Sequence, residues 1–580
     1  MSKKLLGTVF GSTSGGIRNG FLGLTATLLA SLALFSPTYA TASTCTNLTS
    51  LTLPDGAVFN TSGVNGAGAS DVSPGATIDR LDGASPLTLT GANAVNQPFC
   101  RVTVVVPNDN GTFTPSAINI EMWLPETTWN DRYEGVGGGG YAGSISSLIP
   151  ALNANYAAAS TDTGHVGGSG TFVLNPDDSL NYGLAVDFAT RSLHELALQT
   201  KFVIHAYYGR RPLYSYWNGC STGGRQGLIE AQDHPDDYDG IWAGSPAVSF
   251  DRLSDAQLWP AVVMNLEVGP AGITQTKLNN ATAAAVTACD ALDGVIDDVI
   301  GDPRKCHFDP ATLVCGAPNA PTSTTLCLTP QEAVAISKIW DGPREVDHHG
   351  RPNGPRLWHG LERGASIGTL GNTSATAILP FSIPLVWFQD WLEQNPSFDW
   401  HTITYPDFEY DFFFSEKRWT HIVASDHADL SRFRRHGGKV IITHGWADQI
   451  IPSMNSVNYY NHVLEDPRNG DHVENFARLF MLPGMGHCGG GNGPNVFDAF
   501  DAVINWRETG VAPEQIIASK VVGGVTVETR PLCPYPQAAQ YTGSGSTNDA
   551  ANFVCVRERD NDRLNHELRI VPNPFEDQFR

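Results

Sequence analysis

The chain has 580 residues and is strongly acidic, with 59 aspartates and glutamates against 36 lysines and arginines, which gives a formal charge of −23. A negative surface repels phosphate groups, so this balance argues against nucleic acid or an anionic membrane as a partner. The length exceeds that of one ordinary hydrophobic core and predicts either two domains or one domain with a large insertion.

The first 42 residues have the pattern of a secretory signal peptide. Residues 1–20 contain basic but no acidic side chains, residues 21–35 are mostly apolar, and residues 40–42 read Ala-Thr-Ala, a small-residue cleavage site. The apolar run is short for a membrane span, although an N-terminal membrane anchor is the alternative. We expect a secreted or periplasmic protein with no other membrane segment. Cleavage after residue 42 removes three positive charges and no negative ones, which leaves −26.

Ten cysteines remain after the leader, an even number with no C-x-x-C pair. In an oxidising compartment this pattern favours disulfides over zinc binding or redox chemistry. Cysteines close in sequence pair most simply with each other, which leaves one N-terminal and one long-range pair; other pairings of ten cysteines stay open. The expected bridges are Cys289–Cys306, Cys315–Cys327, Cys533–Cys555, Cys45–Cys100 and Cys220–Cys488.

Strand-like and helix-like segments alternate through residues 102–243. Alternating strands and helices of this kind predict a mostly parallel sheet with helices on both faces, a doubly wound α/β fold. A glycine run at 137–140 interrupts the pattern. Residues 102–106, 118–124, 214–218 and 240–243 have strand patterns, and residues 187–208 and 225–232 have helical patterns.

This alternation of strands and helices ends near residue 246, and strand-like runs return only at 439–443 and 477–482. The intervening sequence is rich in proline, glycine, aromatic residues and cysteine. We expect one α/β catalytic domain, formed by residues 43–247 and 427–580, that is interrupted by an inserted lid at residues 248–426. Catalytic residues that follow the insertion would place it above the site.

The segment Gly-Cys-Ser-Thr-Gly-Gly at residues 219–224 is the most informative part of the chain. A serine in a small-residue turn between a strand and a helix can present Oγ at the tip of an elbow, where a base can deprotonate it. A serine among glycines is often only a turn. The predicted strand before it and the helix after it favour Ser221 as a nucleophile.

His487, in Gly486-His487-Cys488, is the candidate base. A loop histidine is usually a solvated bystander, but here the candidate base and the candidate nucleophile each have a cysteine neighbour. A disulfide holds its Cα atoms about 4.4–6.8 Å apart. A Cys220–Cys488 bridge would therefore bring Ser221 and His487 together whatever the surrounding fold, unless the placement of both cysteines is coincidental.

Asp448 is the candidate acid that orients His487, because it follows the predicted strand at 439–443 and completes the chain order Ser…Asp…His. Another of the many acidic residues is the alternative. The tetrahedral intermediate of ester hydrolysis also needs N–H donors. The N–H of Thr222 should supply one, and the glycines at 137–140, which lack Cβ atoms, another. A merely flexible glycine loop is the competing interpretation.

An acidic turn at residues 290–299 suggests a metal site. The carboxylates of Asp290, Asp293 and Asp297 can meet the carbonyls of Val295 and Val299, and hard oxygen ligands in a tight turn suit Ca²⁺. The spacing is not that of an EF-hand, so a solvated acidic turn is the alternative. We expect a structural rather than a catalytic Ca²⁺, since the candidate hydrolytic site already has a nucleophile.

Taken together, these motifs resemble the tannase/feruloyl esterase family of α/β-hydrolases, which also includes the hydrolase of mono(2-hydroxyethyl) terephthalate. The likeness runs from about Cys45 to Cys555 and is most specific at Cys220-Ser221, Asp448 and His487-Cys488. The resemblance implies an α/β-hydrolase fold with a lid, these three residues as nucleophile, acid and base, and a bridge between the two cysteines.

The same resemblance extends to the oxyanion and metal sites. Gly140 matches the family's oxyanion glycine, with the N–H of Thr222 as the second donor. The turn at 290–299 matches the family's lid calcium site. Aromatic side chains at Trp387, Phe388 and Trp391 lie where family members place substrate contacts, although a buried lid core would explain them equally well.

The family resemblance implies a secreted carboxylic ester hydrolase for small aromatic esters of the hydroxycinnamoyl or feruloyl type. Gallate esters are the first alternative. Terephthalate monoesters are a weaker one, because residues 405–419 show no clear counterpart of the arginine that grips the free carboxylate. A non-catalytic binding protein should have lost Ser221 or His487, and a serine peptidase should have an open cleft rather than a lid.

Overall fold

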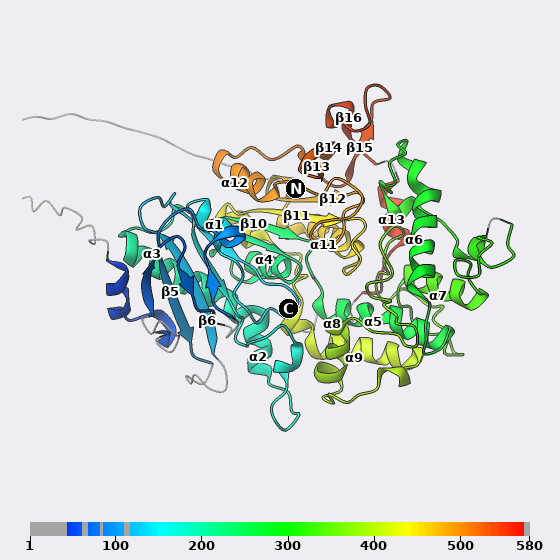
Figure 1. Ribbon diagram of the computed structural model, residues 1–580, viewed down its shortest axis with the longest axis horizontal. Coiled ribbons are helices and arrows are strands. Elements are labelled where there is room, and N and C mark those ends of the chain that lie inside the picture. The colour runs from blue at the N-terminus through cyan, green and yellow to red at the C-terminus, as the bar shows by residue number, and fades with distance from the viewer. Residues whose placement is uncertain are drawn as a thin grey trace, which may run out of the picture. The chain divides into compact units, whose positions relative to one another are not determined.

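The computed structural model describes residues 43–60, 68–81, 85–108, 117–318, 320–558 and 560–572, which all fall within one compact unit, Thr41–Arg580 (Figure 1). The expected signal peptide, residues 1–42, lies outside the described residues. Within these ranges, no helix combines the length and the apolar character needed to cross a membrane.

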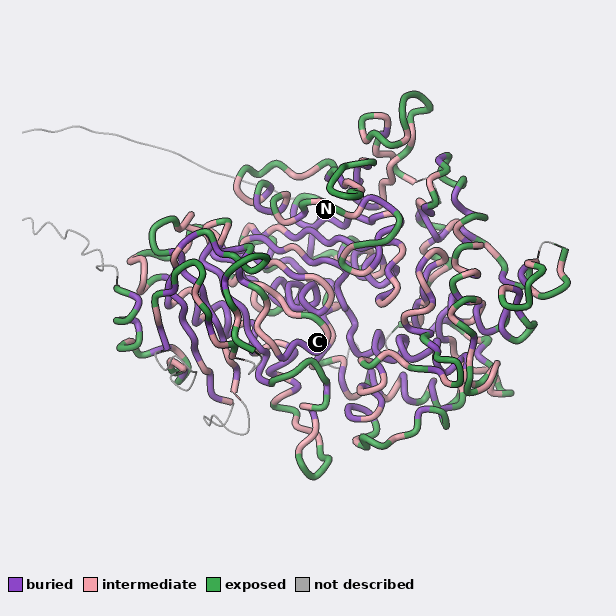
Figure 2. Tube along the Cα trace, in the orientation of Figure 1, coloured by how far each residue is buried: buried purple, intermediate pink, exposed green. Residues whose placement is uncertain are grey.

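A ten-stranded sheet forms the centre of the fold, in the order β1-β5-β6-β8-β7-β9-β10-β11-β12, with β2 also paired to β5. Along this order, each pair of neighbouring strands from β8 through β7 and β9 to β12 is parallel. The pairs that join β1, β2, β5, β6 and β8 are antiparallel. Figure 2 shows these strands as mostly buried. The strands are β1 (Val58–Phe59), β2 (Ala69–Val72), β5 (Phe99–Val106), β6 (Ile118–Pro125), β7 (Arg132–Val136), β8 (Ala157–Thr161), β9 (Tyr214–Cys220), β10 (Gly240–Gly244), β11 (Lys439–Gly445) and β12 (Ala477–Leu482).

Helices cover both faces of this sheet. On one face α3 (Ser192–Tyr208), α4 (Thr222–Asp233) and α11 (Met454–Glu465) share an apolar core with the strands; on the other, α1 (Ile149–Asn153) and α12 (Ala499–Thr509) do so. Strand β11 shows the consequence, since Val440 and Ile442 belong to the first core and Ile441 to the second. A parallel strand buried on both sides needs this continuous apolar run. The doubly wound α/β fold is confirmed.

Between β10 and β11 the described residues form helices and no strand of any sheet. These helices build an apolar cluster of their own around Trp259, Trp387 and Phe412, which also takes in Tyr141 and Phe188 from earlier in the chain. This is the segment that the sequence assigns to an inserted lid. Its helices are α5 (Phe250–Glu267), α6 (Gln275–Cys289), α7 (Pro330–Asp341), α8 (Ser382–Val386) and α9 (Tyr405–Val423), whereas α10 (Ser431–His436) follows the segment and packs through Phe433 in the first core of the sheet.

The remaining strands do not belong to the central sheet, although Ile516, Ala518 and Leu532 pack in its second core. Three two-stranded sheets are antiparallel, and two short helices complete the fold. They are β3 (Thr77–Ile78) with β4 (Leu87–Thr88), β13 (Ile516–Val522) with β14 (Val525–Leu532), β15 (Gln537–Tyr541) with β16 (Phe553–Arg557), α2 (Tyr182–Val186) and α13 (Asn561–Glu567).

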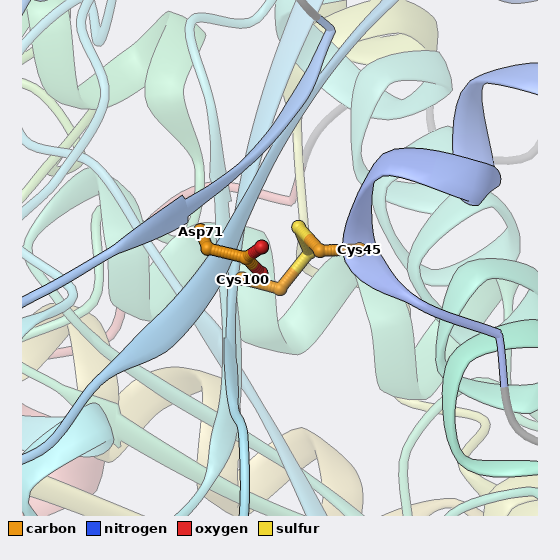
Figure 3. A group of neighbouring side chains, drawn as sticks. All are labelled: Cys45, Asp71 and Cys100. Carbon is orange, nitrogen blue, oxygen red and sulfur yellow. A yellow bond between two sulfur atoms is a disulfide. The ribbon is translucent and has the colours of Figure 1, made fainter.

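All five expected disulfides are present, and the described residues contain no free cysteine. Figure 3 shows the first of them, Cys45–Cys100, which ties the N-terminal segment to β5 beside Asp71 of β2. Four bridges join residues 12 to 55 positions apart, whereas Cys220–Cys488 spans 268 positions. This long-range bridge therefore links the end of β9 to the loop after β12.

Candidate active site

Ser221 occupies a strained turn between β9 and α4. Its backbone has φ 63° and ψ −124°, a conformation that residues with a Cβ rarely adopt. The turn is also crowded, because a Cβ at Gly219 would lie 2.4 Å from the carbonyl oxygen of Gly223, and a Cβ at Gly224 would lie 2.5 Å from that of Gly244. The small residues around Ser221 are thus a steric requirement of an elbow that presents the serine at the carboxyl edge of the sheet.

His487 and Asp448 meet at the same edge. The Nδ1 of His487 lies 2.8 Å from Oδ2 of Asp448. Asp448 is fully buried, whereas the His487 side chain keeps 13% of its surface exposed. A carboxylate at Nδ1 orients the imidazole and leaves Nε2 to act as the base.

The Cys220–Cys488 bridge connects the two halves of the site, with 6.0 Å between its Cα atoms. It joins the residue before Ser221 to the residue after His487. The hydrogen bonds of the described residues do not include one from Ser221 Oγ to His487. In free hydrolases this contact is often long and closes in the substrate complex.

The two expected oxyanion donors lie next to each other. The Thr222 hydroxyl donates a 2.5 Å hydrogen bond to the carbonyl oxygen of Gly140. Thr222 is the first residue of α4, and the first N–H groups of a helix have no intrahelical acceptor. In the glycine run, the N–H of Gly137 bonds to Asn218 and that of Gly138 to Gln226. Gly140 has φ 59°, which a glycine adopts without strain.

Two residues that no sequence pattern singles out contact the candidate acid and the candidate base. The Nε2 of His444 lies 3.2 Å from Oδ2 of Asp448, and Oε1 of Gln449 accepts a 3.1 Å hydrogen bond from the backbone N–H of His487. Both residues flank Asp448 in one short segment, and this proximity to the candidate acid is the sequence signal that could have identified them.

The electrostatics of the site keep Asp448 ionised. Burial by itself raises the pKa of this carboxyl, but hydrogen bonds from His444 and His487 outweigh it and hold the pKa well below its ordinary value. The backbone N–H groups of Ile450 and Ile451 also donate to Oδ1, each at 2.9 Å. The site therefore has a fixed negative charge behind His487 that can stabilise an imidazolium.

The predicted calcium ligands lie in one turn, but their carboxylates are already engaged. Asp290 accepts hydrogen bonds from the N–H groups of Asp297, Asp298 and Val299, at 3.0, 3.2 and 3.4 Å. Asp293 Oδ1 accepts one from Val295 at 2.9 Å. Across the described chain, groups of three ligand atoms within 4.8 Å of one another do not include these aspartates.

Other features of the turn fit a cation. Oδ1 of Asp297 is buried without a hydrogen-bond partner, although Oδ2 pairs with Arg530 at 2.7 Å. Burial, partly offset by Arg530, raises the pKa of Asp297 to about 6, and burial also raises the pKa of Asp293. Both side chains line a cavity of about 80 Å³ together with Val299. A divalent cation there would satisfy the unpaired oxygen and favour the ionised carboxylates.

Two other groups of ligand-type side chains lack the features of a metal site. The sulfurs of Cys45 and Cys100, beside Asp71, are joined in a disulfide and offer no thiolate (Figure 3). The rings of His194 and His234, beside Asp237, are stacked 4.6 Å apart at 17°. Stacked rings direct their in-plane lone pairs side by side and not toward one ion.

Trp387, Phe388 and Trp391 have no exposed surface. The indole N–H of Trp387 donates to Asp255, and that of Trp391 donates to the carbonyl of Gly170. Of the two interpretations left open by the sequence, the structure shows these three side chains packed in the core of the insertion.

Comparison with known proteins assigns the chain to a family. The family described as tannase and feruloyl esterase matches residues 100–556. A probable feruloyl esterase of Arthroderma benhamiae is 36% identical over 79% of this chain and 87% of its own length. The mono(2-hydroxyethyl) terephthalate hydrolase of Piscinibacter sakaiensis is 31% identical over 80% of this chain and 86% of its own.

A solved structure agrees with this relationship. The crystal structure of feruloyl esterase B from Aspergillus oryzae has a TM-score of 0.73 and 27% identity, and the alignment covers 88% of this chain and 99% of that one. The chain belongs to the tannase and feruloyl esterase family of carboxylic ester hydrolases.

Proposed function

We propose that the protein hydrolyses esters of aromatic carboxylic acids through an acyl-enzyme, with Ser221 as nucleophile, His487 as general base and Asp448 as the acid that orients it. The observation that carries this proposal is the 2.8 Å contact between His487 Nδ1 and Asp448 Oδ2, tied by the Cys220–Cys488 bridge to the strained serine turn. These groups fill the roles of a Ser-His-Asp triad.

The reaction proceeds in two matching halves. His487 takes the proton of Ser221 as Oγ attacks the ester carbonyl, and the negative oxygen that forms is stabilised by the N–H groups of Thr222 and Gly140. Collapse of this intermediate expels the alcohol, which receives the proton from His487. Water then attacks the acyl-enzyme by the same steps and releases the acid. Asp448 stays ionised throughout and stabilises the imidazolium.

Hydroxycinnamoyl esters of the feruloyl type are the leading substrate class, because a relative named as a probable feruloyl esterase is 36% identical over most of the chain. Gallate esters remain the first alternative within the same family. Terephthalate monoesters are disfavoured, since the guanidinium of Arg418, within residues 405–419, donates to the carbonyls of Trp391 and Leu392 and packs over the ring of Phe414.

Two further properties belong to this proposal. The turn at residues 290–299 binds a structural Ca²⁺ through Asp290, Asp293, Asp297 and the carbonyls of Val295 and Val299, supported by the buried, unpartnered Oδ1 of Asp297. The protein is secreted or periplasmic, supported by the leader-like composition of residues 1–42 and by five disulfides.

A substrate panel tests the proposed function. Methyl ferulate, methyl gallate and mono(2-hydroxyethyl) terephthalate would be compared by kcat/KM, together with a peptide library and fluorophosphonate labelling of Ser221. We expect labelling at Ser221 and the highest kcat/KM for methyl ferulate. A preference for methyl gallate would select tannase activity. Absence of both labelling and ester hydrolysis would refute the proposal.

A further inference from the structure

His444 is held at both ring nitrogens behind the proposed triad. It lies on β11, four residues before Asp448, and both side chains are fully buried. Its Nε2 lies 3.2 Å from Oδ2 of Asp448 and 3.2 Å from the carbonyl oxygen of Ile451, and its Nδ1 lies 2.7 Å from Oγ of Ser456 on α11.

These partners define the protonation of the ring. The carbonyl of Ile451 and the ionised carboxylate of Asp448 can only accept hydrogen bonds, so Nε2 carries the proton. In a neutral imidazole Nδ1 then accepts from the Ser456 hydroxyl. The neutral Nε2–H form satisfies every partner and adds no positive charge that would compete with an imidazolium at His487.

The carboxylate of Asp448 consequently has one orientation. Its Oδ1 accepts from two backbone N–H groups, of Ile450 and Ile451, and its Oδ2 faces the two histidines. Without His444, Oδ2 of the fully buried Asp448 would keep His487 as its only side-chain donor. A buried carboxylate that loses a charge-assisted donor rotates or takes up a proton, because nothing else replaces the lost hydrogen bond.

We propose that His444 is a positioning residue that acts through Asp448: its Nε2–H holds Oδ2 where the carboxylate receives Nδ1–H of His487. The inference rests on the proposed function, since it concerns the geometry of the same site. It predicts that loss of the Nε2 donor misaligns the base and slows acylation, while leaving the substrate contacts unchanged.

The chain offers a matched pair of substitutions for the test. In His444→Gln the amide nitrogen reaches the position of Nε2, whereas in His444→Asn it reaches only that of Nδ1. The measurements are kcat and KM for the best ester, the rate of fluorophosphonate labelling at Ser221, the pH profile of kcat/KM and the melting temperature of each full-length variant.

We expect His444→Asn to lower kcat and the labelling rate by about 30- to 100-fold with KM changed less than about threefold, because misplacement of a catalytic group by about 1 Å has an effect of this size. His444→Gln should lose only about 3- to 10-fold. The acid limb of kcat/KM should move to lower pH in His444→Asn, since a misaligned carboxylate stabilises the His487 imidazolium less. A purely structural role would not move that limb.

Equal labelling rates in the Asn and Gln variants would overturn the inference, as would an unchanged acid limb in His444→Asn. Should His444→Asn fail to fold, His444→Phe decides, because its ring fills the same space without a donor at the position of Nε2. A loss of about 30- to 100-fold at nearly unchanged KM supports the inference, and a rate equal to that of His444→Gln overturns it. Absence of both Ser221 labelling and ester hydrolysis in the wild-type protein would refute the proposed function and this inference together, a result distinct from the others.

Discussion

Cys220 and Cys488 are joined in a disulfide whose Cα atoms lie 6.0 Å apart, directly beside Ser221 and His487 in the sequence. The bridge links the end of β9 to the loop after β12, so a disulfide holds the proposed nucleophile and the proposed base close together. Each of the other four disulfides lies away from both residues in sequence and closes a much shorter loop.

Replacing both Cys220 and Cys488 by alanine should therefore harm catalysis more than stability. We expect kcat to fall about a hundredfold, because the loops carrying Ser221 and His487 can then separate. The melting temperature should also fall, since the bridge closes a long loop in the unfolded chain. Steady-state kinetics of the folded fraction would measure the first effect and calorimetry the second.

The matched control replaces Cys533 and Cys555 by alanine. That variant should lose melting temperature but keep kcat within about threefold, because its bridge joins the residue after β14 to β16, both remote in sequence from the triad. Peptide mapping without reduction should recover Cys220 and Cys488 in one linked fragment. If either cysteine is found free, or if both double variants have the same kcat, the positioning role of the bridge is wrong.

Ser221→Ala should abolish ester hydrolysis without unfolding the protein. Removal of a nucleophile costs several orders of magnitude in kcat, since only positioning and the oxyanion donors remain. The melting temperature should stay close to that of the wild type, because alanine fits the same elbow. Activity within about tenfold of the wild type would refute the assignment.

Calcium should stabilise the protein and take no part in the chemistry. Chelation should lower the melting temperature, because a metal bound only by the folded state stabilises it by mass action. Asp297→Ala should have the same effect and make the melting temperature insensitive to chelation. Elemental analysis would count the bound metal.

Asp298→Ala is the matched control for this prediction, because Asp298 is an exposed neighbour outside the expected ligand set. It should bind calcium as the wild type does. A wild-type melting temperature that does not change on prolonged chelation, with no metal detected, would eliminate the site.

The buried carboxyl of Glu134 should make the free energy of unfolding decrease as the pH rises from about 4.5 to 7. Burial raises the pKa of this β7 carboxyl to about 7, although Asn218 donates a hydrogen bond that partly opposes the shift. In the unfolded chain its pKa is near 4.5, so between these values the folded protein binds more protons and its free energy of unfolding decreases with pH. The contribution is complete below 4.5 and lost above 7.

Glu134→Gln should flatten this part of the pH profile, because the amide stays neutral at every pH. The measurement is the free energy of unfolding by denaturant at pH 4.5, 6 and 7.5 in both proteins. A profile that is equally steep in the variant would show that another group titrates in this range.

The sequence by itself predicted the α/β class and the three proposed catalytic residues, because these predictions rest on local patterns: alternating apolar periods, and small residues around a serine. An even number of cysteines favoured the five disulfides, but other pairings stayed open until the structure showed which cysteines are joined. The sequence also placed the strand before Ser221, although β9 extends to Cys220 and α4 begins at once with Thr222. Strand β8, Ala157–Thr161, was not predicted, since alanine and serine have little preference for strands and its pairing with β6 and β7 decides its conformation.

Only the tertiary structure decided which side chains meet. It buried Trp387 and Trp391 in the insertion, engaged Asp290 with backbone N–H groups, and placed His444 between Asp448 and Ser456. The contacts of Trp387, Trp391 and Ser456 have no signature in the sequence, because each joins elements whose approach depends on the packing of the whole chain. A local pattern specifies an element, whereas a buried polar contact exists only when the surrounding core excludes water from both partners.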